Sequence, residues 1–215
     1  MASASDYSGW SRETMLLVNN VLLVSSTTMI LIGTLYPLLA DVLDLGKISV
    51  GPPYFSFFFV PITSLMMLFL GFAGFTRWKK SDNAMMLSRG ALPSIVSLTL
   101  ALLLPAMMAE PLSWQTYSLT AVVTLFLSLW VITMTMEDVL LKSSGSVKKL
   151  KALTGSYWGM VLAHSGLAVC VIGVGLSSAY DMQRDVRMVP GDFVEVADYE
   201  FQFLGVERVD GPNFI

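Results

Sequence analysis

Residues 155–177 read GSYWGMVLAHSGLAVCVIGVGLS, and this apolar run decides the fold. It contains no Asp, Glu, Lys or Arg, and it is long enough to cross the roughly 30 Å hydrocarbon core of a bilayer. A segment at that depth has no water to satisfy its backbone N–H and C=O groups, so it must bond them internally. The run therefore predicts a transmembrane helix, with His164 near its middle.

Four more stretches share this character. They lack charged side chains and can span a membrane, and they cover Met15–Ala40, Tyr54–Phe75, Ala91–Ala109 and Thr116–Met136. Of the 215 residues, 54% are hydrophobic and 13% are charged, whereas soluble domains carry about 25% charged residues. The composition excludes a soluble enzyme and predicts an all-α integral membrane protein of about five transmembrane helices surrounded by membrane lipid.

The charge and cysteine counts exclude further classes. A net charge of −3 offers no basic surface for nucleic acid. Cys170 is the only cysteine, which excludes a disulfide framework and a multi-cysteine metal site. The sequence also lacks a Gly-rich phosphate loop and a Ser–His–Asp set.

The distribution of Lys and Arg predicts the orientation in the membrane. Two loops on one side hold eight of the thirteen cations: Arg77, Lys79, Lys80 and Arg89 in one, and Lys142, Lys148, Lys149 and Lys151 in the other. The opposite loops hold one, Lys47. Because cytoplasmic loops are enriched in Lys and Arg, we expect a cytoplasmic N-terminal segment at residues 1–14, a five-helix region at 15–178 and a tail on the far side.

The tail Asp181–Ile215 has a different periodicity. Apolar and polar residues alternate around Phe193 and through Tyr199–Phe203, and turn signals such as Pro190-Gly191 and Asp210–Pro212 bound these runs. Alternation at period two predicts two or three short β-strands. So few strands do not form a stable unit alone. We therefore expect residues 179–215 to be a truncated extracytoplasmic β segment, cut off inside a small β domain.

His164 is the main candidate for chemistry. Ionisable residues deep in a membrane are costly and are functional candidates by default. A neutral imidazole has one free lone pair, which suits an axial ligand of haem iron. A hydrogen bond across a helix interface and a proton relay stay open as alternatives, although relays chain several ionisable groups. Small residues at Gly155, Gly159 and Ala163 allow a helix or a flat macrocycle to approach.

The loop Gly46–Phe55 is a second candidate. Two glycines and a Pro pair fix a turn before the second helix. Lys47 is suited to meet a carboxylate or propionate, and Tyr54 is a further candidate contact. The same pattern is also typical of an ordinary rigid helix–helix connection.

A set of short segments follows the order of one known family. The segments are SRET at Ser11–Thr14 with LVNN after it, Gly33–Leu38, GKISVGPPYF at Gly46–Phe55, LAHSGLAV at Leu162–Val169, Arg184–Arg187, Pro190-Gly191 and Gly211–Asn213. The loop combined with the histidine of the last helix is specific. On these segments, and over essentially its whole length, the chain resembles a C-terminal-half fragment of the CcmF/NrfE/CycK family of bacterial cytochrome c-type biogenesis proteins, which are haem lyase subunits.

The resemblance implies part of a membrane haem lyase, in a complex that attaches haem to apocytochrome c. His164 matches a family axial ligand of a transmembrane b-type haem, whose second axial ligand lies outside this chain. The implied partners are an apocytochrome-handling subunit, a haem chaperone and apocytochrome c. The implied location is the bacterial inner membrane, with the tail in the periplasm. The family's tryptophan-rich haem-presenting segment has no counterpart here, so we do not expect the chain alone to be active.

Two other functions stay open. A membrane transport module would need discontinuous helices and intramembrane charges, and the five stretches offer only a weak break at Gly33–Pro37. A non-catalytic membrane scaffold would use His164 as a structural histidine.

Overall fold

The computed structural model describes residues 11–76, 83–108, 118–181, 183–196 and 199–207. The chain divides into two compact units, Met1–Leu176 and Ser177–Ile215. Four regions of the sequence-based predictions lie outside the described residues. They are the N-terminal segment before residue 11, the cations Arg77, Lys79 and Lys80, residues 109–117 with the predicted span boundaries Ala109 and Thr116, and the end of the tail after residue 207.

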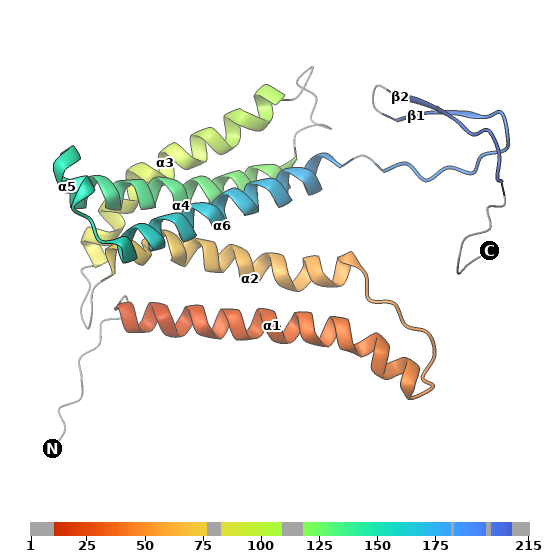
Figure 1. The fold of residues 1–215 in the computed structure, drawn as a ribbon, viewed down its shortest axis with the longest axis horizontal. Coiled ribbons are helices and arrows are strands. Elements are labelled where there is room, and N and C mark those ends of the chain that lie inside the picture. Colours follow the sequence, from red (N-terminus) through yellow and green to blue (C-terminus); the bar gives the residue numbers. More distant parts are fainter. Residues whose placement is uncertain (1–10, 77–82, 109–117, 182, 197–198, 208–215) are drawn as a thin grey trace. The chain divides into compact units, whose positions relative to one another are not determined.

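The first unit is built from helices (Figure 1). They are α1 (Arg12–Val42), α2 (Pro52–Phe72) with a short 3-10 turn η1 (Ala73–Phe75), α3 (Asn83–Met108), α4 (Leu119–Ser143), α5 (Val147–Lys151) and α6 (Gly155–Tyr180). All except α5 and η1 are long and apolar enough to cross a membrane, which makes five candidate spans in the described part of the chain. The predicted fold class is therefore confirmed.

Local sequence explains where these helices begin. The Ser11 side chain accepts the N–H of Thr14 at 3.3 Å and caps α1, and Ser118 caps α4 in the same way. Helix α2 begins at Pro52, in the first turn where a missing N–H is harmless. Helix α1 continues unbroken through Pro37, so the weak break suspected at Gly33–Pro37 does not interrupt it.

Two helices extend seven or more residues beyond the apolar runs that predicted them. Helix α3 begins at Asn83 instead of Ala91, and α4 ends at Ser143 instead of Met136. The stop signal for α4 is the left-handed Ser144, at φ 48°, and it comes eight residues after the apolar run ends at Met136. Arg89 and Lys142, which are predicted from the sequence to lie in loops, are therefore helical, and so are the acidic residues Glu137 and Asp138.

Helix α4 is the centre of this unit. It packs against α2 and α3, while α1 packs chiefly on α2. In the most apolar window of α4 half of the residues are buried, against 6% in α1 and in α6. The main core cluster joins three helices through Met67 of α2, Ala168 of α6 and Leu127, Trp130, Val131 and Met134 of α4.

One hydrogen bond fixes the contact between α2 and α4. The indole N–H of Trp130 donates to the carbonyl oxygen of Leu68 at 3.1 Å. A buried indole N–H normally finds such a partner. The large apolar side chains of α1 are mostly exposed, as expected for a surface that faces lipid or further helices, whereas most of those on α6 are partly buried.

The second unit contains one antiparallel hairpin. Strand β1 (Phe193–Val196) pairs with β2 (Tyr199–Gln202), with Phe193 opposite Gln202 and Val196 opposite Tyr199. The turn signal Pro190-Gly191 lies just before β1, where Gly191 has a φ of +101° that favours glycine. The predicted short strands are therefore present in the described part of the tail.

Candidate functional site

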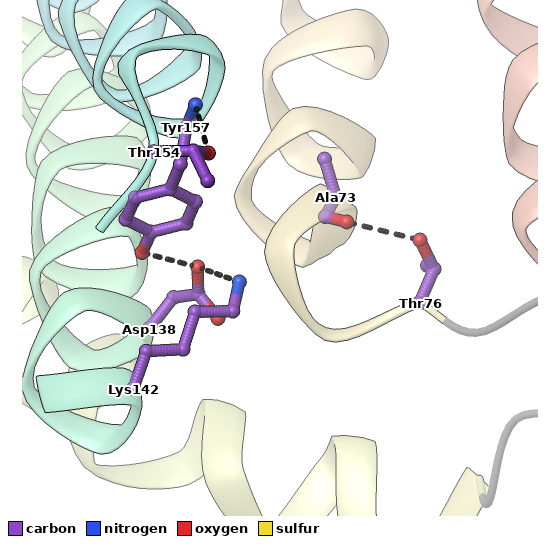
Figure 2. Close-up of polar contacts among 6 residues, drawn as sticks. All are labelled: Ala73, Thr76, Asp138, Lys142, Thr154 and Tyr157. Carbon is purple, nitrogen blue, oxygen red and sulfur yellow. Dashed lines mark hydrogen bonds and ion pairs between the residues drawn. The ribbon is translucent and has the colours of Figure 1, made fainter. Parts of the chain in front are cut away.

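A buried carboxylate lies near the end of α4 (Figure 2). Asp138 is 5% exposed, and its Oδ2 accepts a bond from Lys142 Nζ at 2.6 Å and one from the Tyr157 hydroxyl at 2.7 Å. The Lys142 ammonium also lies over the Tyr157 ring, 4.4 Å from its centroid. A buried charge is tolerated only when it is paired and hydrogen-bonded, and Asp138 meets both conditions.

The end of α2 packs against this carboxylate. A Cβ built on Gly74 would lie 2.8 Å from Cγ of Asp138, so only glycine fits there without a shift. Figure 2 also shows the Thr76 hydroxyl donating to the Ala73 carbonyl, at 2.9 Å, which closes the turn that carries Gly74. Asp138 therefore joins the end of α2, the end of α4 and the start of α6. We call Asp138, Lys142 and Tyr157 the polar junction.

A second ion pair lies at the same end of the helices. Arg89 near the start of α3 is 3.8 Å from Glu137, the neighbour of Asp138 on α4. Both side chains are partly exposed, so the pair contributes little by itself. The pair nevertheless shows that the start of α3 lies beside the end of α4. The Gly46–Phe55 loop lies at the opposite end, because it precedes α2 whereas Gly74 follows α2.

His164 lies on α6, half-buried, two helical turns after Tyr157. Residues seven apart share a helix face, and Tyr157 and Ala168 both contact α4. His164 therefore lies on the side of α6 that faces α4. Within the described residues its imidazole makes no hydrogen bond and no ion pair, so the structure offers no partner for the cross-helix bond considered above.

The small residues of α6 leave one side of the helix open. A Cβ built on Gly155, Gly159 or Gly166 would meet no atom within 4 Å. The described residues contain no cluster of three or more His, Cys, Asp or Glu able to hold a metal ion. A neutral imidazole fits the donor chemistry of a haem iron as one axial ligand, and His164 is the only histidine of the sequence.

The loop candidates lie apart from His164, at the other end of the helices. The Tyr54 hydroxyl donates to the carbonyl of Met29 on α1 at 3.1 Å, and its ring packs on Phe55 and Phe58. A Cβ built on Gly33 would lie 2.6 Å from the Tyr54 ring, so Tyr54 fills the contact between α1 and α2. Lys47 is exposed and makes no ion pair with the described residues.

The polar junction was missed by sequence reasoning. The apolar run predicts an end of the helix at Met136, which leaves Asp138 outside the helix and places Lys142 in the following loop. Their spacing of four residues is that of a helical ion pair and could have signalled a longer helix. The contact with Tyr157 had no local signal, since it depends on how α6 packs against α4.

Comparisons with known proteins agree with this architecture. A family model described as the CcmF C-terminal beta-sandwich matches residues 179–215. No solved structure matches the chain.

Several curated relatives match nearly the whole chain, and three of them serve as examples. It is 42% identical over 207 residues to the cytochrome c-type biogenesis protein CcmF of Pseudomonas aeruginosa, and 38% identical over 205 residues to CcmF of Escherichia coli. It is 32% identical over 212 residues to the cytochrome c-type biogenesis protein CycK of Rhizobium meliloti. Each match covers 95% of this chain and 30–31% of the relative. With its five apolar helices and its β hairpin, the chain thus belongs to the CcmF/NrfE/CycK family of cytochrome c-type biogenesis proteins, and it spans about a third of the length of these relatives.

Proposed function

We propose that this chain acts in cytochrome c maturation, as part of a membrane haem lyase that attaches haem to apocytochrome c. The names of its relatives support the process, since each is a cytochrome c-type biogenesis protein. The proposed partners are the other maturation subunits, namely an apocytochrome-handling subunit and a haem chaperone, together with apocytochrome c. Because the chain spans about a third of the length of its relatives, the activity belongs to a longer assembly.

Within that assembly His164 is proposed to be one axial ligand of a b-type haem in the membrane. This proposal rests on one observation. The imidazole of His164 is half-buried on the side of α6 that faces α4, and it has no hydrogen-bond partner among the described residues. Such a haem supplies one-electron transfer when it is bound. The chain's own contribution is to orient the imidazole: Tyr157 and Ala168, on either side of it, attach α6 to α4.

The proposed location is the bacterial inner membrane. Residues 1–14 are placed in the cytoplasm, residues 15–178 in the membrane and residues 179–215 in the periplasm as part of a β domain. The support is the excess of Lys and Arg in two loops. The helix ends that carry these two loops lie together in the structure. Arg89 of α3 pairs with Glu137 of α4, and Gly74 after α2 lies against Asp138 of α4.

The test is the reduced-minus-oxidised absorption spectrum of the purified full-length protein that contains this chain. We expect a b-type spectrum that is lost in His164→Ala and kept in Cys170→Ala, a matched control because Cys170 is exposed on the same helix. A spectrum unchanged in His164→Ala would contradict the ligand assignment. Absence of haem from the wild-type protein would favour a transport module or a non-catalytic scaffold, with His164 as a structural residue.

A further inference from the structure

The short helix α5 lies between two membrane spans. It occupies Val147–Lys151, while α4 ends at Ser143 and α6 begins at Gly155. Only a few residues join it to each span, so α5 cannot leave the membrane surface. The connection is ordered by hydrogen bonds: the N–H of Ser146 donates to the Ser143 carbonyl and that of Leu150 to the Ser146 carbonyl, both at 2.9 Å.

The lysines of α5 have no carboxylate partner. Lys148, Lys149 and Lys151 are exposed, and none of them forms an ion pair with the residues that the structure describes. The nearby acid Asp138 is already bonded by Lys142. Lys149 donates to the hydroxyl of Ser144 at 3.2 Å, which holds its ammonium beside the end of α4. The positive charges of these three lysines are therefore not neutralised by any described carboxylate, and they are available to bind external anions.

The apolar residues of α5 indicate where it lies. Val147 and Leu150 are three residues apart and share one side, and Lys148 and Lys151 share the adjacent side. Val147 is 67% exposed, with no protein surface covering it. An amphipathic turn of this kind rests in the interface with its apolar side toward the acyl chains and its lysines among the headgroups. The neighbouring Trp158, in the first turn of α6, suits the same depth.

We propose that Lys148, Lys149 and Lys151 form a binding surface for the phosphate groups of anionic phospholipids. Ammonium groups bind phosphate as point charges. Basic clusters next to a transmembrane helix attract anionic lipids. The two spans hold this surface at headgroup level, where a lipid phosphate reaches it without leaving the bilayer. This site is separate from the proposed function of His164, so either can fail without the other.

The experiment measures lipid preference by native mass spectrometry. The full-length protein is placed in nanodiscs that contain equal amounts of phosphatidylglycerol and phosphatidylcholine, and the lipids it retains are counted. We expect the wild type to retain phosphatidylglycerol preferentially and the Lys148→Gln, Lys149→Gln, Lys151→Gln variant to lose this preference. Each single Gln variant should lower the preference about fivefold.

Two controls separate charge from folding and from position. The matching triple Lys→Arg variant keeps the charge and should keep the preference. Lys47→Gln removes a cation at the other end of the helices and should leave the preference unchanged. A triple Gln variant that still retains phosphatidylglycerol as the wild type does would overturn the proposal.

The salt dependence of lipid retention is a second measurement, and it uses only the wild-type protein. Because the attraction is electrostatic at an exposed surface, the preference of the wild type should fall as the salt concentration rises from about 0.1 M to 1 M. Inorganic phosphate at matched ionic strength should displace no more lipid than chloride does. Equal retention of both lipids at low salt would refute the site, and specific displacement by phosphate would assign the surface to a soluble anion.

Discussion

Tyr157 on α6 donates its hydroxyl hydrogen to Oδ2 of Asp138 on α4, across a distance of 2.7 Å. The bond joins residues nineteen positions apart and attaches the first turn of α6 to the end of the most buried helix. Figure 2 shows that Lys142 reaches the same oxygen from one turn further along α4. The start of the helix that carries His164 is therefore held by a charged hydrogen bond.

Tyr157→Phe should destabilise the protein without preventing its insertion. The variant keeps the ring over Lys142 but leaves Asp138 with one donor fewer, and a lost hydrogen bond to a charged group costs about 1.5–3 kcal/mol. The free energy of unfolding in mixed micelles measures the effect. Tyr54→Phe serves as a control, since it removes a hydroxyl that donates to a neutral carbonyl. A Tyr157→Phe loss no larger than that of Tyr54→Phe would contradict the importance of the polar junction.

Gly74→Ala should force the end of α2 away from Asp138. Its new Cβ would meet Asp138 Cγ at 2.8 Å, and overpacking of a buried contact costs about 1–3 kcal/mol. Gly159→Ala is the matched control, because a Cβ there meets nothing within 4 Å and alanine favours a helix by about 1 kcal/mol. Thermal unfolding in detergent should therefore shift in opposite directions for the two variants. An unfolding temperature of Gly74→Ala equal to or above that of the wild type would show that the contact with Asp138 accommodates a Cβ.

Tyr54→Phe should loosen the contact between α1 and α2 slightly and leave haem content unchanged. The Tyr54 hydroxyl donates to the Met29 carbonyl, and a neutral hydrogen bond contributes about 0.5–1.5 kcal/mol. The unfolding free energy and the haem absorbance of the same preparation measure both effects. A loss of haem with normal stability would instead support the candidate role of Tyr54 as a ligand contact.

The orientation proposed from the basic loops makes a labelling prediction. In a Cys170→Ala background, a cysteine at Lys47 should react with a membrane-impermeant maleimide added to intact spheroplasts. A cysteine at Lys149 should react only after permeabilisation. Both positions are exposed, so access to solvent does not limit the comparison. The reverse pattern of labelling would invert the orientation.

The sequence predicts the five spans well because length and hydrophobicity alone define them. It places the end of α4 seven residues early, since the helix continues after the apolar run and stops only where Ser144 adopts a left-handed conformation. The contact of Trp130 with the Leu68 carbonyl lies beyond local prediction, because it depends on which helix packs beside α4. His164 is identifiable because it is the only histidine, whereas the bond between Tyr157 and Asp138 that attaches its helix to α4 emerges only from the packing.

The spacing of Asp138 and Lys142 has a consequence for the order of assembly. A chain leaves the ribosome N-terminus first, so α4 reaches the membrane before α6 does. Tyr157 cannot yet contact Asp138 at that moment, but Lys142 is already present one turn away on the same helix. Lys142 can pair with the Asp138 carboxylate as soon as α4 inserts, so α4 does not enter the membrane with an unpaired charge. When α6 follows, the Tyr157 hydroxyl donates the second hydrogen bond to Asp138, so that α6 packs against a helix whose carboxylate is already paired.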